Sequence, residues 1–239
     1  MSRDERWTFA TAAGLGKTPA ERLRDFPREP DLLVYGLRTV AALVLRAWLR
    51  VFHRLVVRGR DNLPSEAFVM IANHQSHLDA PVLVSALPLR RLHRVFPAAA
   101  KDYFFSSLGR SALAAIFVNA LPFGRDRSGR QSLRTCNALL ATPGNVLVLF
   151  PEGTRSRTGE IGRFLPGIGM ILGSTGVPVV PCHLAGCHAA LPKGSRLPRP
   201  HRIELTIGKA MRFGPEVPPR EIAATLERAV RDLAAERAS

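Results

Sequence analysis

Two short polar motifs, each at the end of an apolar run, constrain this chain more than any other feature. The first has the sequence Asn-His-Gln-Ser-His-Leu-Asp at residues 73–79 and directly follows the apolar run Phe68–Ala72. The second, Phe-Pro-Glu-Gly-Thr-Arg-Ser at residues 150–156, directly follows Val146–Leu149. Short apolar runs bounded by turn residues are typical of buried strands. The sequence therefore predicts one site at the edge of a sheet, with a base and its orienting acid from the first motif and an anion grip from the second.

Runs that suit strands alternate with helical patterns through most of the chain. We expect strands at residues 54–59, 67–72, 94–99, 117–122, 145–150, 177–184 and 202–208, and helices at 77–87, 101–116, 130–141, 165–174 and 219–237. This alternation predicts an α/β fold in which helices flank a sheet. The longest uncharged stretch runs from Phe164 past Cys182, but its prolines and glycines favour a short helix, a turn and a buried strand over a membrane span.

The charge balance points to an anionic partner. The chain carries 34 Lys and Arg against 19 Asp and Glu, a net charge of +15, spread along the whole sequence. Nucleic acid, an anionic membrane surface and phosphate-bearing substrates would all suit this charge. No zinc-finger spacing or RNA-binding aromatic signature is present, so we do not expect a nucleic-acid partner. The three cysteines form no C-x-x-C pair, which favours a reducing, cytosolic compartment and core-filling thiols.

The first fifty residues divide into two segments ahead of the main domain at residues 54–239. Residues 1–30 are polar and mixed in charge, and we expect them to be poorly ordered. Residues 31–53 have the pattern of an amphipathic helix, with Arg38, Arg46, Arg50, His53 and Arg54 on one side and Val40, Val44, Leu45, Trp48, Val51 and Phe52 on the other. A basic amphipathic helix with a Trp is typical of an interfacial membrane anchor. The alternative is a surface helix that packs its apolar face on the core.

His74 and Asp79 can meet only if a turn separates them. Positions five apart on one helix diverge by about 140°, so we place His74 in the turn after the strand and Asp79 in the first turn of the next helix. Ser76 would then suit the N-cap and Asp79 would also serve as the acid of a capping box. As chemistry, the imidazole would take a proton from an attacking hydroxyl while the carboxylate fixes its tautomer. Because no G-x-S-x-G motif exists, direct attack by a substrate hydroxyl is the simplest scheme.

A metal site is the competing interpretation of the first motif. His74, His77 and Asp79 form H-x-x-H-x-D, which lacks the H-x-H-x-D-H spacing of metallo-β-lactamase-like hydrolases. The H-E-x-x-H signature is also absent. We therefore expect no metal.

The second motif has the residue types of an anion site. Gly153 would let the backbone approach a ligand, Arg155 would supply a planar donor fork, and Thr154 would add a hydroxyl. Glu152 could hold Arg155 or bind a substrate hydroxyl. Lys101 and Arg125 each follow a predicted strand and could add a cation to the same pocket, although either could equally be a solvated surface charge.

The motifs, taken in order, resemble those of the lysophospholipid acyltransferase family, which includes bacterial 1-acyl-glycerol-3-phosphate acyltransferases. Residues 73–79 match its N-H-x-x-x-x-D block, residues 150–156 match F-P-E-G-T-R-S, and residues 177–181 match its apolar fourth block. Residues 117–125 match the second block more loosely, because Pro-Phe-Gly stands before Arg125. The resemblance covers about residues 54–210.

This resemblance implies a mechanism and a set of substrates. His74 would be the general base and Asp79 its partner. The residues that would bind the acceptor, through its phosphate and glycerol, are Asn73, Lys101, Arg125, Glu152, Gly153, Thr154 and Arg155. Pro181 would help to shape the acyl side. The donor would be acyl-CoA or acyl-acyl carrier protein, and no metal or organic cofactor would be needed because the thioester is already activated.

The resemblance also implies a fold and a location. Residues 54–239 would form the acyltransferase domain, a mixed sheet flanked by helices as in glycerolipid acyltransferases. The enzyme would convert 1-acyl-glycerol-3-phosphate to phosphatidic acid, as a peripheral or monotopic protein on the cytoplasmic face of the cell membrane. Three alternatives stay open: another lysolipid acceptor, an esterase or thioesterase that uses the same base, and a non-enzymatic basic module.

Overall fold

The computed structural model of the chain describes residues 32–100, 121–123, 129–195 and 197–238. Several expectations fall outside these ranges: the N-terminal segment, the helix at 101–116, most of the strand at 117–122, and both Lys101 and Arg125. The described elements follow the alternation read from the sequence. In chain order they are α2 (Leu32–Phe52), β1 (Val56–Arg58), η1 (Arg60–Asn62), β2 (Phe68–Ala72), α3 (Asp79–Ala86), η2 (Leu89–Arg94), β3 (Val95–Ala100), β4 (Leu121–Phe123), α6 (Gly129–Leu140), β5 (Val146–Leu149), α7 (Gly167–Thr175), β6 (Val179–Ala185), α8 (Cys187–Ala190), β7 (Glu204–Ile207) and α9 (Pro219–Ala238).

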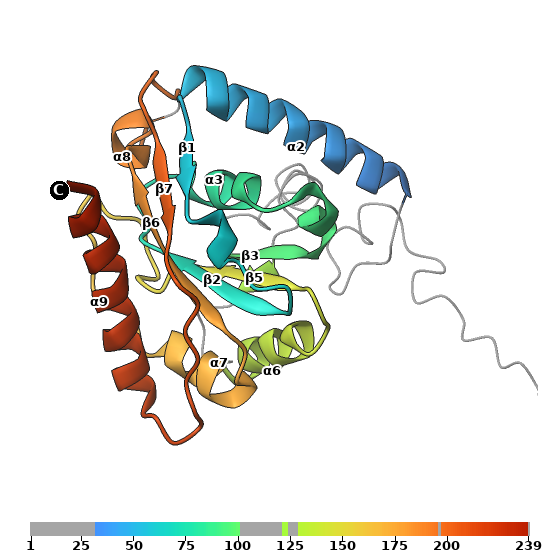
Figure 1. Ribbon diagram of the computed structural model, residues 1–239, viewed down its shortest axis with the longest axis vertical. Helices are drawn as coiled ribbons and strands as arrows, with labels where there is room; N and C mark the ends of the chain where they lie inside the picture. Colours follow the sequence, from blue (N-terminus) through green and yellow to red (C-terminus); the bar gives the residue numbers. More distant parts are fainter. Residues whose placement is uncertain (1–31, 101–120, 124–128, 196, 239) are drawn as a thin grey trace, which may run out of the picture.

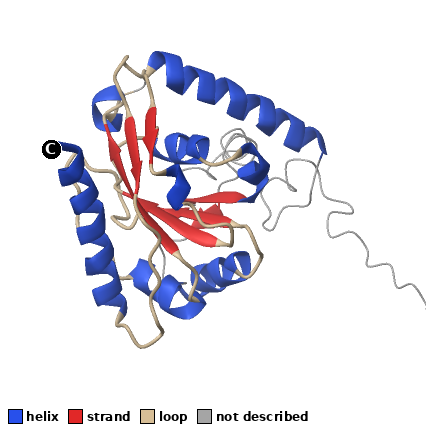
Figure 2. Cartoon of the chain, in the orientation of Figure 1, coloured by secondary structure: helices blue, strands red, loops and turns tan. Residues whose placement is uncertain are grey.

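The strands form one mixed sheet in the order β1-β7-β6-β2-β5-β3-β4. Strands β6, β2, β5, β3 and β4 are parallel to their neighbours within this group, whereas β7 runs antiparallel to β6 and parallel to β1. Helices lie on both sides of the sheet, which confirms the predicted α/β class (Figure 2). The uncharged stretch after Phe164 forms α7, a turn and β6, as expected.

Two apolar cores, one on each face, explain why the central strands read as unbroken apolar runs. Along β2, Phe68, Met70 and Ala72 pack on one face with residues of α2 and α3. Val69 and Ile71 pack on the other face with residues of α6, α7 and α9. Strands covered on both faces have no polar side, so their sequences do not alternate. This arrangement leaves the strand ends as the places where polar groups of β2 and β5 can be exposed.

The arginines of α2 do not all lie on one exposed face. Arg38 is buried and Arg46 donates a hydrogen bond to the carbonyl of Leu87, which caps α3. Guanidinium groups suit the unpaired carbonyls at the end of a helix, which is a physical reason for this inward face. Arg50 remains exposed.

The apolar side of α2 is divided between the core and the surface. Leu45 and Trp48 pack on the core beneath the helix, whereas Val40, Val44 and Val51 are exposed. Figure 1 shows α2 lying along the outside of the molecule, beyond β1 and α3. No helix in the described part of the chain is long and apolar enough to cross a membrane.

Candidate active site

The two polar motifs lie side by side because β2 and β5 are parallel neighbours. Ile71 of β2 pairs with Leu149 of β5, so both strands end at nearly the same level. Residues 73–79 leave the end of β2 and residues 150–156 leave the end of β5. Polar groups beyond the carboxyl ends of parallel strands form the ligand site in many α/β proteins. The two motifs therefore meet at one edge of the sheet, as the sequence predicted.

Within the first motif, His74 and Asp79 form a close pair. Nδ1 of His74 lies 2.8 Å from Oδ2 of Asp79, which is fully buried as the first residue of α3. The same carboxylate oxygen accepts hydrogen bonds from the backbone amides of Gln75, at 2.6 Å, and Ser76, at 2.8 Å. Asp79 thus orients the imidazole and holds the loop, which combines the two roles that the sequence left as alternatives.

The expected capping box is only half formed. Asp79 accepts the Ser76 amide as a capping-box acid does, but α3 begins one residue after Leu78, which is its N-cap. The Ser76 hydroxyl accepts the Leu78 amide at 3.1 Å and donates to the carbonyl of Leu191 at 2.8 Å. Ser76 therefore anchors the loop to the segment after α8.

The second ring nitrogen of His74, Nε2, makes no contact with Asp79. The ring of His74 stacks on Phe150, with centroids 4.0 Å apart and planes 14° from parallel. Its side chain is 22% exposed, and within the described residues Nε2 has no hydrogen-bond partner in the protein. Since the carboxylate of Asp79 favours a proton on Nδ1, Nε2 is the nitrogen that can accept one.

Cys187, which the sequence marked only as a core filler, lies behind this pair. It is fully buried at the start of α8. Burial raises the pKa of the Cys187 thiol, and the nearby Asp79 carboxylate raises the pKa further. The thiol is therefore protonated and faces the carboxylate.

Glu152 joins the two motifs. Its Oε1 accepts the backbone amide of His74 at 2.9 Å, while the Ser156 amide donates to the carbonyl of His74 at 2.8 Å. Burial raises the pKa of Glu152, and hydrogen bonds from the amides of His74 and Gly162 oppose that rise. A Cβ on Gly162 would lie 2.8 Å from Oε2, so a glycine suits this close approach. The contacts of Glu152 hold the loops together, and none of them is with Arg155.

Gly153 has a conformational role. Its φ of +70° lies in the left-handed region, and a Cβ there would lie 2.8 Å from Cδ1 of Leu165. The sharp turn needs glycine for both reasons. The turn brings the Thr154 and Arg155 backbone to the mouth of a cavity next to Glu152.

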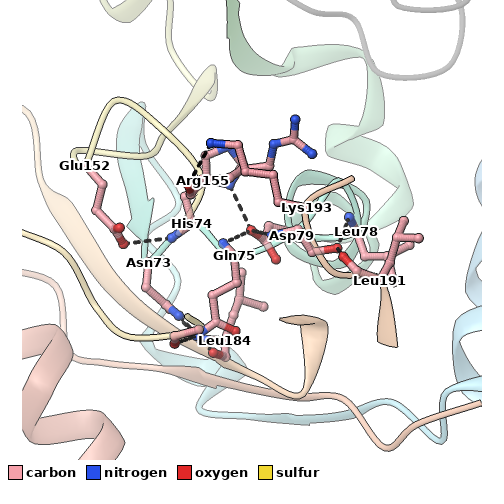
Figure 3. Close-up of polar contacts among 12 residues, drawn as sticks. Asn73, His74, Gln75, Leu78, Asp79, Glu152, Arg155, Leu184, Leu191 and Lys193 are labelled. Atoms are coloured by element: carbon pink, nitrogen blue, oxygen red, sulfur yellow. Dashed lines mark hydrogen bonds and ion pairs between the residues drawn. The ribbon is translucent and has the colours of Figure 1, made fainter. Parts of the chain in front are cut away.

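Four basic side chains line that cavity, which has a volume of about 490 Å³. Its cationic walls come from three segments of the chain, and its lining is Glu152, Thr154, Arg155, Ser156, Arg157, Gly162, Arg163 and Lys193. Nζ of Lys193 donates to the carbonyl of Arg155 at 3.3 Å and lies 3.5 Å from the Thr154 hydroxyl (Figure 3). Burial is the largest cause that lowers the pKa of His77, and the positive charge of Arg155 lowers this pKa further.

Lys193, Arg157 and Arg163 are additions that sequence reasoning missed. Lys193 follows α8 and reaches the motif at 150–156 from almost forty residues away, with no local signal of its own. Gln75 is a further addition, because its side-chain amide donates to the carbonyl of Gly159 at 2.6 Å and ties the same loops together.

Asn73 is paired with a neighbouring strand. It is fully buried, its amide nitrogen donates to the carbonyl of Leu184 at 2.9 Å, and its amide oxygen accepts the Leu184 amide at 2.8 Å. Figure 3 shows Asn73 turned toward Leu184 and away from Arg155 and Lys193. The side chain extends the pairing between β2 and β6 by one step. This pairing gives Asn73 a structural role, and its expected role in substrate binding stays a prediction.

Pro181 lies within β6, paired with Ile71 inside the buried sheet. It does not line the 490 Å³ cavity, so its expected role on the acyl side stays a prediction. As for the competing metal interpretation, the described side chains include no group of three His, Cys, Asp or Glu arranged to hold a metal ion.

Several known proteins are similar to this chain in sequence. A chloroplastic 1-acyl-sn-glycerol-3-phosphate acyltransferase of Arabidopsis thaliana is 34% identical over 148 residues, which are 60% of this chain and 39% of that protein. The 1-acyl-sn-glycerol-3-phosphate acyltransferase of Pseudomonas aeruginosa is 29% identical over 178 residues, 74% of this chain and 66% of that protein. The chain spans between 39% and 47% of the length of the three relatives matched at 34% identity.

A solved structure agrees with this fold, and a family model matches the part of the chain that carries both motifs. The crystal structure of the 1-acyl-sn-glycerophosphate acyltransferase PlsC from Thermotoga maritima matches with a TM-score of 0.64 and 25% identity, covering 85% of this chain and 79% of that one. The family model described as Acyltransferase matches residues 54–185, which include both polar motifs and make up more than half of the chain. This chain therefore belongs to the acyltransferase family.

Proposed function

We propose that this protein transfers a fatty acyl group from a thioester, acyl-CoA or acyl-acyl carrier protein, to the free hydroxyl of a lysophospholipid. The acceptor we favour is 1-acyl-glycerol-3-phosphate, which would give phosphatidic acid. The observation that carries the proposal is the contact of 2.8 Å between His74 and Asp79 beside a cationic cavity of about 490 Å³. The relatives named above as 1-acyl-sn-glycerol-3-phosphate acyltransferases support the choice of acceptor.

The reaction needs one base and no covalent enzyme intermediate. Nε2 of His74 removes the proton of the acceptor hydroxyl as the hydroxyl oxygen attacks the thioester carbonyl carbon. Asp79 stabilises the imidazolium that forms, because its carboxylate lies against Nδ1. When the tetrahedral intermediate collapses, the C–S bond breaks and the thiolate takes the proton back from Nε2. The ester product and the free thiol leave, and His74 is neutral again.

The acceptor phosphate would occupy the cationic cavity. Arg155, Arg157, Arg163 and Lys193 line it, and Glu152, the one carboxylate in its described lining, is held by the backbone of the neighbouring loops. One guanidinium group can donate two parallel hydrogen bonds to a phosphate, which fixes the orientation of the ligand as well as its position. With its phosphate bound there, the acceptor would present its glycerol hydroxyl to His74, whose backbone amide donates to Glu152.

A membrane surface would bring the lipid substrate to the site. The exposed apolar residues of α2, Val40, Val44 and Val51 among them, form a stripe that water solvates poorly. A helix with this pattern lies in the bilayer interface with its apolar face among the acyl chains. We propose a peripheral or monotopic enzyme on the cytoplasmic face of the membrane, without a metal or organic cofactor.

An acceptor panel tests this proposal. Labelled oleoyl-CoA, and in parallel an acyl-carrier-protein thioester, are offered with a series of lysolipids on liposomes, with and without a chelator. We expect chelator-resistant formation of phosphatidic acid from lysophosphatidic acid. Transfer only to another lysolipid would keep the chemistry and replace the acceptor. Free fatty acid without any acylated lipid, from both kinds of donor, would show a thioesterase.

A further inference from the structure

A second and larger cavity lies under α2. It has a volume of about 890 Å³ and is bounded by α2, β1, η1, the C-terminal end of α3 and the start of η2. Figure 1 shows these elements together, with α2 running past β1 and α3. Among the described residues, five arginines line it, Arg46, Arg50, Arg60, Arg90 and Arg91, and no Asp or Glu does.

This cavity is separate from the candidate active site. Pro64 and Ser65 line it just before β2 begins, whereas His74 follows the opposite end of that strand. Five strand residues span about 16 Å. The cavity also lies at the end of α3, whose first residue is Asp79. A group bound there is out of reach of the acyl-transfer chemistry.

The arginines have hydrogen-bonding capacity that the described part of the protein does not use. Arg46 donates one bond to Leu87, and Nη2 of Arg91 donates to the carbonyl of Ser65 at 2.5 Å. Nε of Arg46 and Nη1 of Arg91 are buried and have no hydrogen-bond partner among the described residues. None of the five forms an ion pair within that part of the chain. Buried donors without partners are costly unless a ligand or water satisfies them.

The arginines are also close enough to repel one another. Burial lowers the pKa of Arg46, and the charge of Arg60 lowers the pKa further. Burial likewise lowers the pKa of Arg91, followed by the effect of Arg90. An anion between these groups would relieve both the repulsion and the missing hydrogen bonds.

The walls and the position of the cavity select the kind of anion. Leu55, Val57 and Leu63 line it beside the arginines, so it offers apolar contact as well as charge. Arg50 stands next to Val51, an exposed member of the apolar stripe of α2. A helix that lies in the bilayer interface places such a pocket at the level of the lipid headgroups.

We propose that this arginine-lined cavity binds the phosphate headgroup of an anionic membrane phospholipid, with its glycerol end against the apolar wall. The site would orient α2 on the bilayer and make membrane binding depend on anionic lipid. The proposal rests on the membrane placement of α2 and not on the acyl-transfer activity, so a binding measurement tests it without any turnover.

Vesicle binding by the full chain provides the test. One variant replaces three cavity arginines whose side chains make no hydrogen bond among the described contacts, Arg50→Gln, Arg60→Gln and Arg90→Gln. A control of equal net charge replaces three exposed arginines that lie outside both cavities, Arg199→Gln, Arg220→Gln and Arg228→Gln. Each protein is mixed with phosphatidylcholine vesicles and with vesicles that also contain phosphatidylglycerol. Thermal unfolding with inorganic phosphate is followed in parallel.

We expect phosphatidylglycerol to strengthen binding of the wild type and of the control, and the cavity variant to lose at least about tenfold of that affinity. The control should lose about twofold or less, because charges beyond about 10 Å from the lipid are screened. Equal losses in both variants would mean diffuse attraction and would overturn the proposal. Stabilisation by inorganic phosphate that only the cavity variant loses, with unchanged vesicle binding, would assign the cavity to a soluble phosphate compound and overturn the lipid assignment. Failure to bind phosphatidylcholine alone would instead argue against the apolar stripe of α2.

Discussion

One carboxylate oxygen of Asp79 holds both the imidazole of His74 and the loop that carries it. It accepts from His74 and from the amides of Gln75 and Ser76. Because these contacts come from residues within one turn of chain, the position of His74 depends little on distant packing. The orientation of the base is therefore a local property of this motif.

Replacing Asp79 by Asn tests whether the reaction needs the negative charge of this carboxylate. The amide oxygen can replace Oδ2 toward these three donors, but the neutral amide cannot stabilise an imidazolium as a carboxylate does. We expect kcat to fall by about a hundredfold or more, in line with loss of general-base function. Steady-state rates of acyl transfer measure this. Asp232→Asn, on the exposed surface of α9, removes the same charge elsewhere and should not change the rate. An Asp79→Asn enzyme as fast as wild type would remove Asp79 from the mechanism.

Arg155 and Lys193 should act on the acceptor more than on the donor. Both line the cavity proposed for the phosphate, and Lys193 contacts the backbone of Arg155. We expect Arg155→Ala and Lys193→Ala each to raise the KM of lysophosphatidic acid by about tenfold, the loss of one charge-assisted hydrogen bond, with less effect on the KM of the thioester. Arg199→Ala is the control. Equal effects on both substrates would move the phosphate elsewhere.

Asn73 should act on stability and not on substrate affinity. Its removal leaves the amide and carbonyl of Leu184 buried without partners, which we expect to cost about 2–4 kcal/mol in the free energy of unfolding. Asn62 makes a single bond to the carbonyl of Ile207 and is only half-buried, so Asn62→Ala should cost less. Urea unfolding of the two Ala variants compares them. If Asn73→Ala left stability unchanged and raised the acceptor KM, the side chain would belong to the substrate site after all.

For single residues, the sequence predicted contacts between side chains that belong to the same motif. His74 and Asp79 meet because the strand end and the helix start are both readable from local residues. The function of Asn73 was not readable, because its partner Leu184 is on another strand. Lys193 was missed for the same reason, since only the tertiary fold brings it to the loop of Arg155.

Helix α2 turns Arg38 and Arg46 inward and much of its apolar surface outward. Arg46 satisfies a carbonyl at the end of α3, while Val44 and Val51 are exposed. Periodicity showed that the helix has two faces, but it could not show which face meets the core, because the carbonyls of α3 that attract Arg46 come from a different element. An outward apolar stripe is unfavourable in water and favourable at a bilayer surface.

The stripe can be tested with one valine. Val51 and Leu197 are each 80% exposed, but only Val51 belongs to α2. Val51→Gln should weaken binding to neutral phosphatidylcholine vesicles by up to about tenfold, the transfer free energy of one valine side chain. Leu197→Gln, with a similar change in polarity, should leave binding unchanged. Sedimentation with vesicles measures both, and equal weakening would assign membrane contact to a broader surface than α2.

The sheet as a whole determines where chemistry can occur. Both faces of β2 are covered, by α2 and α3 on one side and by α6, α7 and α9 on the other, so polar side chains gather at the strand ends. The alternation of elements predicted the α/β class, and the motifs predicted the edge at which the site lies. The sequence did not reveal that β7 enters antiparallel to β6, because strand order and direction depend on long-range contacts between elements.

Stability of the whole molecule should fall in mild acid. His53 is fully buried against Trp48, and burial lowers its pKa below the usual value of 6.5. As pH falls below about 6.5 the unfolded chain takes up this proton first, so the free energy of unfolding decreases. His53→Asn keeps a donor for the carbonyl of His201 but cannot be protonated. We expect its urea midpoint to fall less than that of wild type between about pH 7 and pH 5.5. Parallel pH slopes for the two proteins would show that His53 does not contribute.

The activity of His74→Ala, measured beside wild type, bears most directly on the proposed reaction. Both proteins are assayed for conversion of lysophosphatidic acid and oleoyl-CoA to phosphatidic acid, with His201→Ala as a control for removal of an exposed histidine. If Nε2 of His74 is the base, the His74→Ala rate is at least about a hundredfold lower while His201→Ala matches wild type. A His74→Ala enzyme that retains its rate would contradict general-base catalysis by the His74–Asp79 pair.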